Sequence, residues 1–273
     1  SEASHMSASV PSPGRLRAES VTLRYDQRVV STGLSVDVPG DEFTGIIGPN
    51  ACGKSTLLRS LSRLLRPAAG EVTLDGRSLA SFKPKEFART VGLLPQSSIA
   101  PEGITVVDLV SRGRFPYQKL VRQWTDADEA AVRDAMTATN VAELATREVA
   151  ELSGGQRQRV WAAMAIAQQT PILLLDEPTT YLDLTHQIEM LDLFARLHRA
   201  GTTIVAVLHD LNQAARYATH LIVLKAGEVI ATGAPSEVLT EHLVREVFEL
   251  NCVVMPDPVS GTPLIVPTDG EWR

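Results

Sequence analysis

The chain has few cysteines, and this scarcity argues against one class of protein. Its 273 residues contain two of them, Cys52 and Cys252. Two cysteines provide no disulfide framework of the kind that stabilises small secreted domains. We therefore expect a protein of a reducing compartment, in which Cys52 occupies a variable loop position and is not a nucleophile. The chain is long enough to bury a full core, as one large domain or as a domain with a subdomain.

Long apolar runs and an excess of positive charge are also missing. No apolar stretch approaches the roughly 18–20 residues of a membrane-spanning helix, and no secretory signal is visible. The formal net charge of -6 argues against a nucleic-acid binder that relies on bulk positive charge, although a local basic patch stays compatible with it. We expect a soluble, cytoplasmic chain with no nucleic-acid partner. Residues 1–6 look like a cloning remnant, and the Ser/Pro-rich stretch 7–14 is expected to be disordered.

The strongest motif is the stretch 48–56, Gly-Pro-Asn-Ala-Cys-Gly-Lys-Ser-Thr, which fits the pattern G-x-x-x-x-G-K-[ST]. It lies between a short apolar run at 43–47 and a leucine-rich stretch of helical spacing at 57–65. In a strand–loop–helix context, the N–H groups of the loop and of the helix start form a nest for phosphate oxygens. Lys54 would neutralise the β- and γ-phosphates, and the hydroxyl of Ser55 would hold Mg²⁺. The alternative is a glycine turn before a core helix, but the context favours a nucleotide site.

Strands and helices alternate around this motif in the order expected of an α/β fold. Buried apolar runs at 172–175 and 203–208, separated by a helical pattern at 184–199, predict a parallel sheet covered on both faces. Residues 97 to about 150 contain helical patterns only and form a candidate subdomain. Other expected elements are strands at 20–25 and 33–38, hairpins at 71–79 and 221–231, and helices that begin at Thr105, Asp126, Ser153 and Leu211.

Polar side chains follow three of the predicted strands. They lie at the carboxyl ends of these strands, where parallel sheets usually bind ligands. Asp176 and Glu177 end one strand, so one carboxylate can coordinate Mg²⁺ while the other polarises an attacking water. His209 ends another strand and could sense the γ-phosphate, although a lone histidine is more often structural. Gln96 follows a third strand and is placed to contact Mg²⁺ or the water. The alternative for the acidic pair is a solvated strand cap, which the phosphate loop makes the weaker interpretation.

The stretch 152–156, Leu-Ser-Gly-Gly-Gln, predicts a second anion site. Ser153 is a helix N-cap, and Gly154 and Gly155 leave bare N–H groups at the helix start. Because the chain has one phosphate loop and one such nest, a two-fold dimer in which each nest faces the other copy's ATP is the economical arrangement. The alternative is a helix start with no ligand. Each glycine would then lower the stability of the helix by about 1 kcal/mol relative to alanine, with no compensating role.

Taken in order, the segments 48–56, Gln96, 152–156, 172–177, 182–183 and His209 resemble the ATP-binding cassette (ABC) family. They correspond to its Walker A, Q-loop, signature, Walker B, D-loop and H-loop, and the resemblance covers about residues 16–232. It implies that Tyr25, which on the residues alone is a packing residue of a strand, stacks on adenine. It also implies that Glu177 is the general base and Asp176 the Mg²⁺ partner. Ala51 stands where many members have glycine, and because alanine tolerates positive φ poorly we expect an ordinary backbone conformation there.

The resemblance implies an α/β fold of the P-loop NTPase, ABC ATPase type, with ATP and Mg²⁺ as cofactors. This fold has a mixed sheet core, an N-terminal antiparallel β subdomain and an inserted α-helical subdomain at about 97–165. The ATPase domain would span 15–247 and a C-terminal β extension 248–273. The implied catalytic residues are Glu177, His209 and Gln96, and the implied metal-binding residues are Ser55, Gln96 and Asp176. The implied nucleotide-binding residues are Tyr25, Gly48, Pro49, Asn50, Ala51, Cys52, Gly53, Lys54, Ser55, Thr56, Ser153, Gly154, Gly155, Gln156 and Asp183.

A narrower resemblance rests on the segments 93–96, 112–117, 179–183 and 248–267, which are similar to the ATPase subunits of ferric-siderophore importers. It implies a homodimer with two ATP at its interface, bound to permease subunits at the cytoplasmic face of the membrane through a groove near Gln96. An extracytoplasmic substrate-binding protein would be an indirect partner. The alternatives are the ATPase of a haem, cobalamin or other importer or of an exporter, and a non-transport ABC ATPase. Members of the last class typically carry a long coiled-coil insertion or tandem cassettes, which this sequence lacks.

Overall fold

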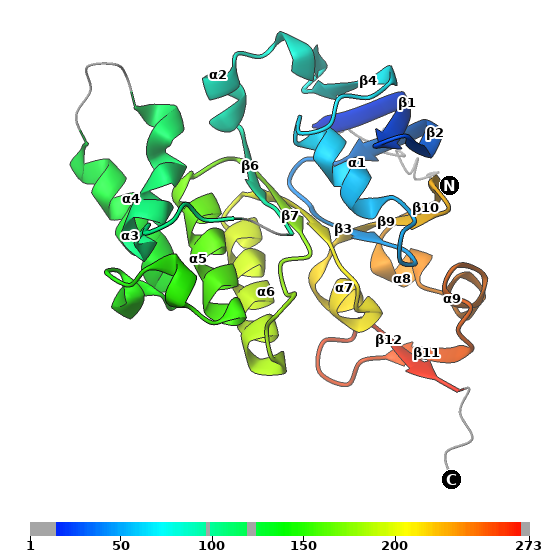
Figure 1. The fold of residues 1–273 in the computed structure, drawn as a ribbon. Coiled ribbons are helices and arrows are strands. Elements are labelled where there is room, and N and C mark those ends of the chain that lie inside the picture. Colours follow the sequence, from blue (N-terminus) through cyan, green and yellow to red (C-terminus); the bar gives the residue numbers. More distant parts are fainter. Residues whose placement is uncertain (1–14, 97–98, 119–123, 269–273) are drawn as a thin grey trace, which may run out of the picture.

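The computed structural model describes residues 15–96, 99–118 and 124–268. Their strands form a six-stranded sheet of order β10-β9-β3-β8-β7-β6, a four-stranded sheet of order β2-β1-β4-β5 and a hairpin of β11 and β12 (Figure 1). The strands are β1 (Leu16–Tyr25), β2 (Arg28–Val38), β3 (Phe43–Ile47), β4 (Ala69–Leu74), β5 (Arg77–Ser78), β6 (Val91–Leu94), β7 (Ile172–Asp176), β8 (Thr203–Val207), β9 (His220–Lys225), β10 (Glu228–Gly233), β11 (Cys252–Pro256) and β12 (Pro263–Pro267). The tail expected at residues 1–14 lies outside the described residues.

The helices of the described residues begin mostly at polar caps. They are α1 (Lys54–Leu61), α2 (Pro84–Ala88), α3 (Val106–Ser111), α4 (Asp126–Ala138), α5 (Gly154–Ala167), α6 (Leu184–Arg199), α7 (Leu211–Tyr217), α8 (Pro235–Val238) and α9 (Glu241–Phe248), with 3₁₀ turns η1 (Leu79–Ser81), η2 (Arg112–Tyr117), η3 (Ala142–Leu144) and η4 (Val149–Glu151). The side chains that accept an N–H bond at a helix start belong to Thr105, Thr125, Ser153, Asp183, Asp210 and Thr240. Each of these bonds satisfies one of the N–H groups that a helix start leaves without a partner, so the sequence fixes where these helices begin.

The central sheet confirms the expectation of parallel strands covered on both faces. Strands β6, β7, β8, β3 and β9 are parallel, and only β10 at the edge runs antiparallel to its neighbour β9. Side chains alternate across it, as the two-residue period of a strand requires. In β7, Leu173 and Leu175 pack with α5 to α9, whereas Ile172 and Leu174 pack with α1 and the antiparallel sheet. The mixed core therefore separates a helical layer from a β layer.

Helix α5 joins the central sheet to the region that contains only helices. Its Ala162 and Ala165 belong to the core on the sheet, while Val160 and Ala163 belong to a separate cluster with α3 and α4. In Figure 1 these helices, coloured green, lie at the opposite side of the molecule from the blue antiparallel sheet. The division into subdomains stays a prediction, and residues 97–98 and 119–123 of the helical region lie outside the described residues.

A buried ion pair ties the helical region together. Arg114 donates from Nε to Asp128 Oδ1 over 2.9 Å, and both side chains are less than a tenth exposed. Its second nitrogen donates to the carbonyl of Ala167 over 2.8 Å, and its guanidinium lies 4.1 Å from the centre of the Tyr117 ring. These contacts hold the 3₁₀ turn η2, to which both Arg114 and Tyr117 belong.

The sequence analysis located most elements but not all of their bounds. The first hairpin is longer at both strands than expected, because β1 pairs with both β2 and β4. No element was predicted for α2, α8 or α9, whose four to eight residues are too few to show a clear helical period. Near the C-terminus β11 and β12 pair antiparallel, and Asn212 of α7 exchanges two hydrogen bonds with the backbone of Ile265 in β12, at 3.2 and 2.7 Å.

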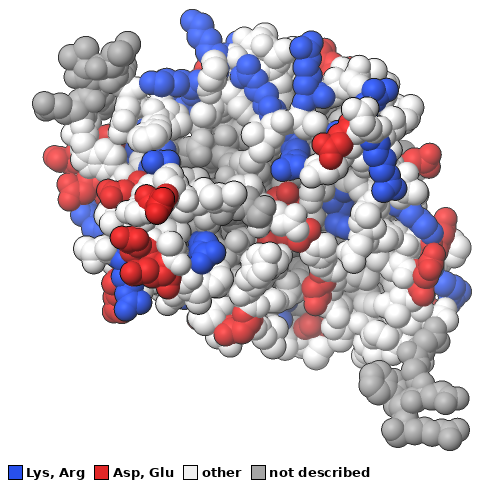
Figure 2. All heavy atoms as spheres, viewed as in Figure 1, with Lys and Arg blue, Asp and Glu red and all other residues white. Residues whose placement is uncertain are grey.

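The surface carries charges of both signs. On the face drawn in Figure 2, acidic and basic side chains are interspersed, and the basic ones are most frequent at the top, where α2 and the antiparallel sheet lie in Figure 1. None of the helices that the structure describes has the length and apolarity needed to cross a membrane.

Candidate nucleotide site

The phosphate loop connects β3 to α1, and its backbone corrects one expectation. Ala51 has a φ of 60°, in the left-handed region, so the ordinary conformation expected for this residue is wrong. The loop is fixed from outside, because the carbonyl of Cys52 accepts a hydrogen bond of 3.0 Å from the N–H of Gly227. Such tertiary constraints override the local preference of alanine, at a cost of about 1–2 kcal/mol.

The start of α1 differs from most helix starts of the chain, because it has no side-chain cap. Its N-cap is Gly53, at a φ of 106°, so the first N–H groups of α1 are left for an external acceptor. Lys54 is 5% exposed, and its Nζ donates to the carbonyls of Gly48 and Pro49, each over 2.8 Å. A buried ammonium and uncapped N–H groups at one helix start make this an anion site.

Ser55 and Asp176 bring two oxygen groups together beside this anion site. The hydroxyl of Ser55 donates to Asp176 Oδ1 over 2.7 Å, which joins the start of α1 to the end of β7. Burial raises the pKa of Asp176, and the hydrogen bond from Ser55 offsets part of this effect. A carboxylate and a hydroxyl are among the hard oxygen ligands that Mg²⁺ prefers, so the residues present fit this cation.

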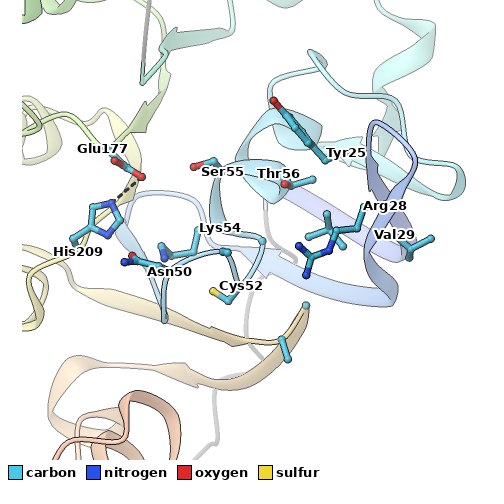
Figure 3. A pocket seen from close by; sticks show the side chains of 15 residues that line it. Tyr25, Arg28, Val29, Asn50, Cys52, Lys54, Ser55, Thr56, Glu177 and His209 are labelled. Carbon is cyan, nitrogen blue, oxygen red and sulfur yellow. Dashed lines mark ion pairs between the residues drawn. The ribbon is translucent and has the colours of Figure 1, made fainter.

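Glu177 lies between the other two residues that follow strands. Its Oε2 accepts a hydrogen bond of 2.7 Å from Gln96 Nε2. Its Oε1 lies 2.7 Å from His209 Nε2, the pair joined by the dashed line in Figure 3. The three residues follow β6, β7 and β8, which are neighbours in the parallel sheet, so their carboxyl ends meet at one edge. Thr180 adds a longer bond of 3.3 Å to Glu177 Oε2. The Glu177 side chain is 12% exposed, which places its carboxylate inside the site but in reach of solvent.

Lys54, Ser55, Glu177 and His209 line one cavity of about 440 Å³. Gln96 and Asp176 line an adjoining hollow of about 290 Å³, which shares Tyr25, Ser55 and Thr56 with it. In Figure 3, Asn50, Lys54 and Ser55 lie between the Glu177–His209 pair on one side and Tyr25 on the other. The ring of Tyr25 is 54% exposed, and the guanidinium of Arg59 lies 5.9 Å from its centre. An exposed aromatic ring at one end of the cavity and phosphate-binding groups at the other match the two ends of a nucleotide.

Five lining residues were missed by the sequence analysis: Arg28, Val29, Val30, Ala226 and Gly227. The first three follow Tyr25 in the same hairpin, so their proximity to it was the available signal. Ala226 and Gly227 form the turn between β9 and β10, which is remote in sequence. A Cβ on Gly227 would lie 2.0 Å from the carbonyl oxygen of Val30, so glycine lets this turn approach β2. No local pattern predicts such a contact.

The remaining expected site residues lie elsewhere in the chain. Ser153, Gly154, Gly155, Gln156 and Asp183 line a second cavity of about 480 Å³, which shares no lining residue with the first. Ser153 and Gln156 form a reciprocal capping box at the start of α5, with bonds of 3.0 and 3.1 Å. The chain alone therefore does not bring this segment to the phosphate loop.

Comparison with known proteins shows the family of this chain. The family model described as "ABC transporter" matches residues 31–180. The chain belongs to the ABC transporter family. It is 54% identical over 257 residues to the ferric enterobactin transport ATP-binding protein FepC of Escherichia coli (strain K12), covering 94% of this chain and 95% of that protein. It is 50% identical to the petrobactin import ATP-binding protein FpuD of Bacillus anthracis, covering 92% of this chain and 93% of that protein.

Solved structures of ABC proteins show the same fold. An inward-facing metal-chelate type ABC transporter matches with a TM-score of 0.78 and 28% identity, covering 93% of this chain and 98% of that chain. The dimeric structure of the bacterial ABC transporter cassette MJ0796 matches with a TM-score of 0.73 and 27% identity, covering 80% of this chain and 98% of that chain. The fold predicted from the sequence is thus confirmed, and a dimeric ABC cassette is among its structural relatives.

Proposed function

We propose that this chain is the ATP-hydrolysing subunit of an importer for ferric–siderophore complexes. The observation that carries this proposal is Glu177 held between Gln96 and His209, beside the Ser55–Asp176 pair. The chain that holds this site is similar over nearly its full length to ATP-binding proteins of ferric enterobactin and petrobactin import.

The residues of the cavity have separate roles in ATP binding and hydrolysis. The N–H groups of the loop and Lys54 bind the phosphates, and to do so Lys54 exchanges its bonds to the carbonyls of Gly48 and Pro49 for bonds to phosphate oxygens. Tyr25 stacks on the adenine. Glu177 takes a proton from the attacking water as that water bonds to the γ-phosphorus, and the products are ADP and inorganic phosphate.

Ser55, Asp176 and Gln96 would hold Mg²⁺. When bound, this cation neutralises charge that develops on the β- and γ-phosphate oxygens. Asp176 has to be ionised for this role, so the burial that raises its pKa opposes the metal-binding form until the cation arrives. His209 orients the Glu177 carboxylate from one side and Gln96 from the other, so the loss of either leaves the base less well positioned.

Hydrolysis in this proposal requires two copies of the chain. The signature residues Ser153, Gly154 and Gly155 line a cavity away from the phosphate loop, so they would complete the site of a second copy. Closure of the dimer would move the helical region, and permease subunits at the cytoplasmic face of the membrane would convert this motion into transport. A substrate-binding protein outside the membrane would deliver the cargo.

Two inactive variants test the shared site when they are mixed. Lys54→Ala and Ser153→Arg each damage both sites of their own homodimer, so each alone should lose ATPase activity. A mixed dimer joins the intact loop of one chain to the intact signature of the other, so an equal mixture should regain at most about a quarter of the wild-type sites. Ser236→Arg, at an exposed position of α8, is the matched control and should keep full activity. Wild-type turnover by either variant alone would show that the site is not shared.

The cargo is tested in a reconstituted importer. Proteoliposomes that contain the chain, its permease and a substrate-binding protein are given an iron-55-labelled siderophore complex. Transport of the label across the membrane should require ATP on the side of the membrane to which the chain is bound. A second cargo, haem, separates siderophore import from the alternative. Uptake of haem without uptake of any ferric siderophore would refute the proposed cargo while leaving the ATPase assignment intact.

A further inference from the structure

A concentration of positive charge that the ATP site does not use lies on the segment that follows α1 and includes α2. Between residues 63 and 89 the sequence has six basic and three acidic side chains, a net charge of +3 in a chain whose net charge is -6. Two of the acidic side chains are paired, Asp75 with Arg15 and Glu86 with Arg77. The basic side chains of this segment that have no carboxylate partner among the described residues are all exposed, and they are Arg63, Arg66, Lys83, Lys85 and Arg89. These five residues are called the basic patch below.

The basic patch is one continuous surface. Arg63 and Arg66 line the same hollow of about 570 Å³ beyond the end of α1. A nitrogen of Arg63 donates to the carbonyl of Phe82 over 3.0 Å, which joins this hollow to the start of α2. From the other side of α2, Lys85 and Arg89 donate to backbone carbonyls of η2 and of the residue after it, each over 2.7 Å. In Figure 2 the basic side chains are most frequent at the top, where α2 and the antiparallel sheet lie in Figure 1.

This surface borders the side of the chain on which the permease is proposed to bind. Leu64, the neighbour of Arg63, is 63% exposed and lines the adjoining hollow of the nucleotide site together with Pro95 and Gln96. The proposed groove for the permease lies near Gln96. A chain held there would bring the basic patch close to the surface of the membrane.

We propose that the basic patch binds anionic lipid headgroups of the membrane beside the permease. This inference rests on the proposed function, because the permease is what would hold the chain at a membrane. The cytoplasmic leaflet has a negative surface potential, which attracts clusters of about four to eight Lys and Arg side chains. The permease itself is the weaker electrostatic match, since the cytoplasmic loops of membrane proteins carry an excess of Lys and Arg. Charge complementarity therefore favours lipid as the occupant of this surface.

The test is sedimentation of the full-length chain with vesicles made of equal parts of phosphatidylcholine and phosphatidylglycerol, at about 50 mM salt so that screening is weak. The side chains of Arg66 and Lys83 form no hydrogen bond or ion pair within the described residues. The double variant Arg66→Gln/Lys83→Gln thus removes two charges without breaking a contact of the fold. The parent should bind these vesicles, and the double variant should bind about 25-fold more weakly. This is about fivefold for each cation, the equivalent of about 1 kcal/mol per cation near an anionic surface.

Two matched controls separate charge from shape and the basic patch from charge elsewhere. Arg66→Lys/Lys83→Arg keeps both charges and should bind like the parent. Arg196→Gln/Arg199→Gln makes the same change in net charge at exposed positions in the last turn of α6. Helix α6 packs on the face of the central sheet opposite to α2, so this variant should also bind like the parent. Raising the salt to about 300 mM should release the parent from the vesicles, because exposed charges are then screened.

The outcomes distinguish this inference from the proposed function. A parent that does not bind the anionic vesicles, or that binds vesicles of phosphatidylcholine alone equally well, would overturn the lipid contact and leave ATP hydrolysis and import as proposed. Equal binding by the parent and Arg66→Gln/Lys83→Gln would also overturn it. If that variant binds vesicles normally but no longer co-purifies with the permease in detergent, the basic patch is a protein contact and the inference is wrong. A parent that binds the anionic vesicles but does not hydrolyse ATP would overturn the proposed function alone.

Discussion

Replacing Glu177 by glutamine separates the charge of the proposed catalytic base from its shape. The carboxylate accepts from Gln96 on one oxygen and lies against His209 on the other, each over 2.7 Å. Glutamine has the same length and keeps one oxygen, but it turns the other acceptor into a donor and cannot take up the proton of the water. General base catalysis is worth about 10²–10⁴-fold, so turnover should fall by that factor, equivalent to about 3–5 kcal/mol of activation free energy.

The same change should have little effect on folding. Its contacts to Gln96 and His209 lie at the strand ends, outside the apolar core, and its backbone φ of 53° is as accessible to glutamine as to glutamate. One of its two strong hydrogen bonds is put at risk, which corresponds to about 1 kcal/mol of the free energy of unfolding. Binding of ATP does not use the base, so ATP-driven dimerisation should persist.

The assay is release of inorganic phosphate under single-turnover conditions, together with equilibrium binding of ATP and urea unfolding. Glu228→Gln makes the identical chemical change at an exposed position of β10 and should keep the parental rate. Hydrolysis by Glu177→Gln at the parental rate would refute the assignment of the base. Loss of both ATP binding and stability would refute the claim that Glu177 acts in chemistry alone.

Two other perturbations probe stability. Asp176→Asn should abolish Mg²⁺-dependent hydrolysis yet stabilise the nucleotide-free chain at neutral pH by on the order of 1 kcal/mol, because it removes a buried charge while keeping an acceptor for Ser55. Burial raises the pKa of Asp176 in the folded chain, so the ionised carboxylate destabilises the fold only above the pKa of the unfolded chain, and this effect grows as the pH rises to the folded pKa. In urea unfolding between pH 4 and 8, the extra stability of Asp176→Asn over the parent should therefore shrink towards acid. Extra stability that is independent of pH would contradict this cause. Arg114→Ala should lower the free energy of unfolding by about 3–5 kcal/mol, because it leaves Asp128 buried without its partner. The control is the exposed Arg133, which lies 3.6 Å from Asp134. Arg133→Ala should lower the free energy of unfolding by less than about 1 kcal/mol in the same experiment. An equal decrease in both variants would contradict the role of burial.

Sequence reasoning predicted those parts of the fold that depend on neighbours in the chain. Helix starts at Thr125, Ser153 and Asp210 are fixed by one side chain and an N–H group three residues later, so the structure agrees with them closely. The hairpin turn at Asp75 and Gly76 has positive φ at both residues, as the dipeptide predicts. Short helices such as α8 were missed, because four residues contain too little periodic signal.

What the sequence determined by itself about this protein is its chemistry and the order of its elements. The phosphate loop, Glu177 and the signature at Ser153 carry their meaning in residue type and spacing. Only the tertiary structure decided how those groups meet. Parallel neighbours β6, β7 and β8 bring Gln96, Glu177 and His209 within hydrogen-bonding distance, although Gln96 and Glu177 are 81 residues apart in sequence.

Tertiary contacts also decided two features of the site on which local reasoning was wrong or silent. Ala51 adopts a left-handed conformation that its side chain disfavours, because the loop around it is held by α1 and by the turn at Gly227. Arg28 and Ala226 line the nucleotide cavity only because two hairpins remote in sequence pack against each other. Local propensities are worth about 1 kcal/mol per residue, and long-range packing of buried strands outweighs them.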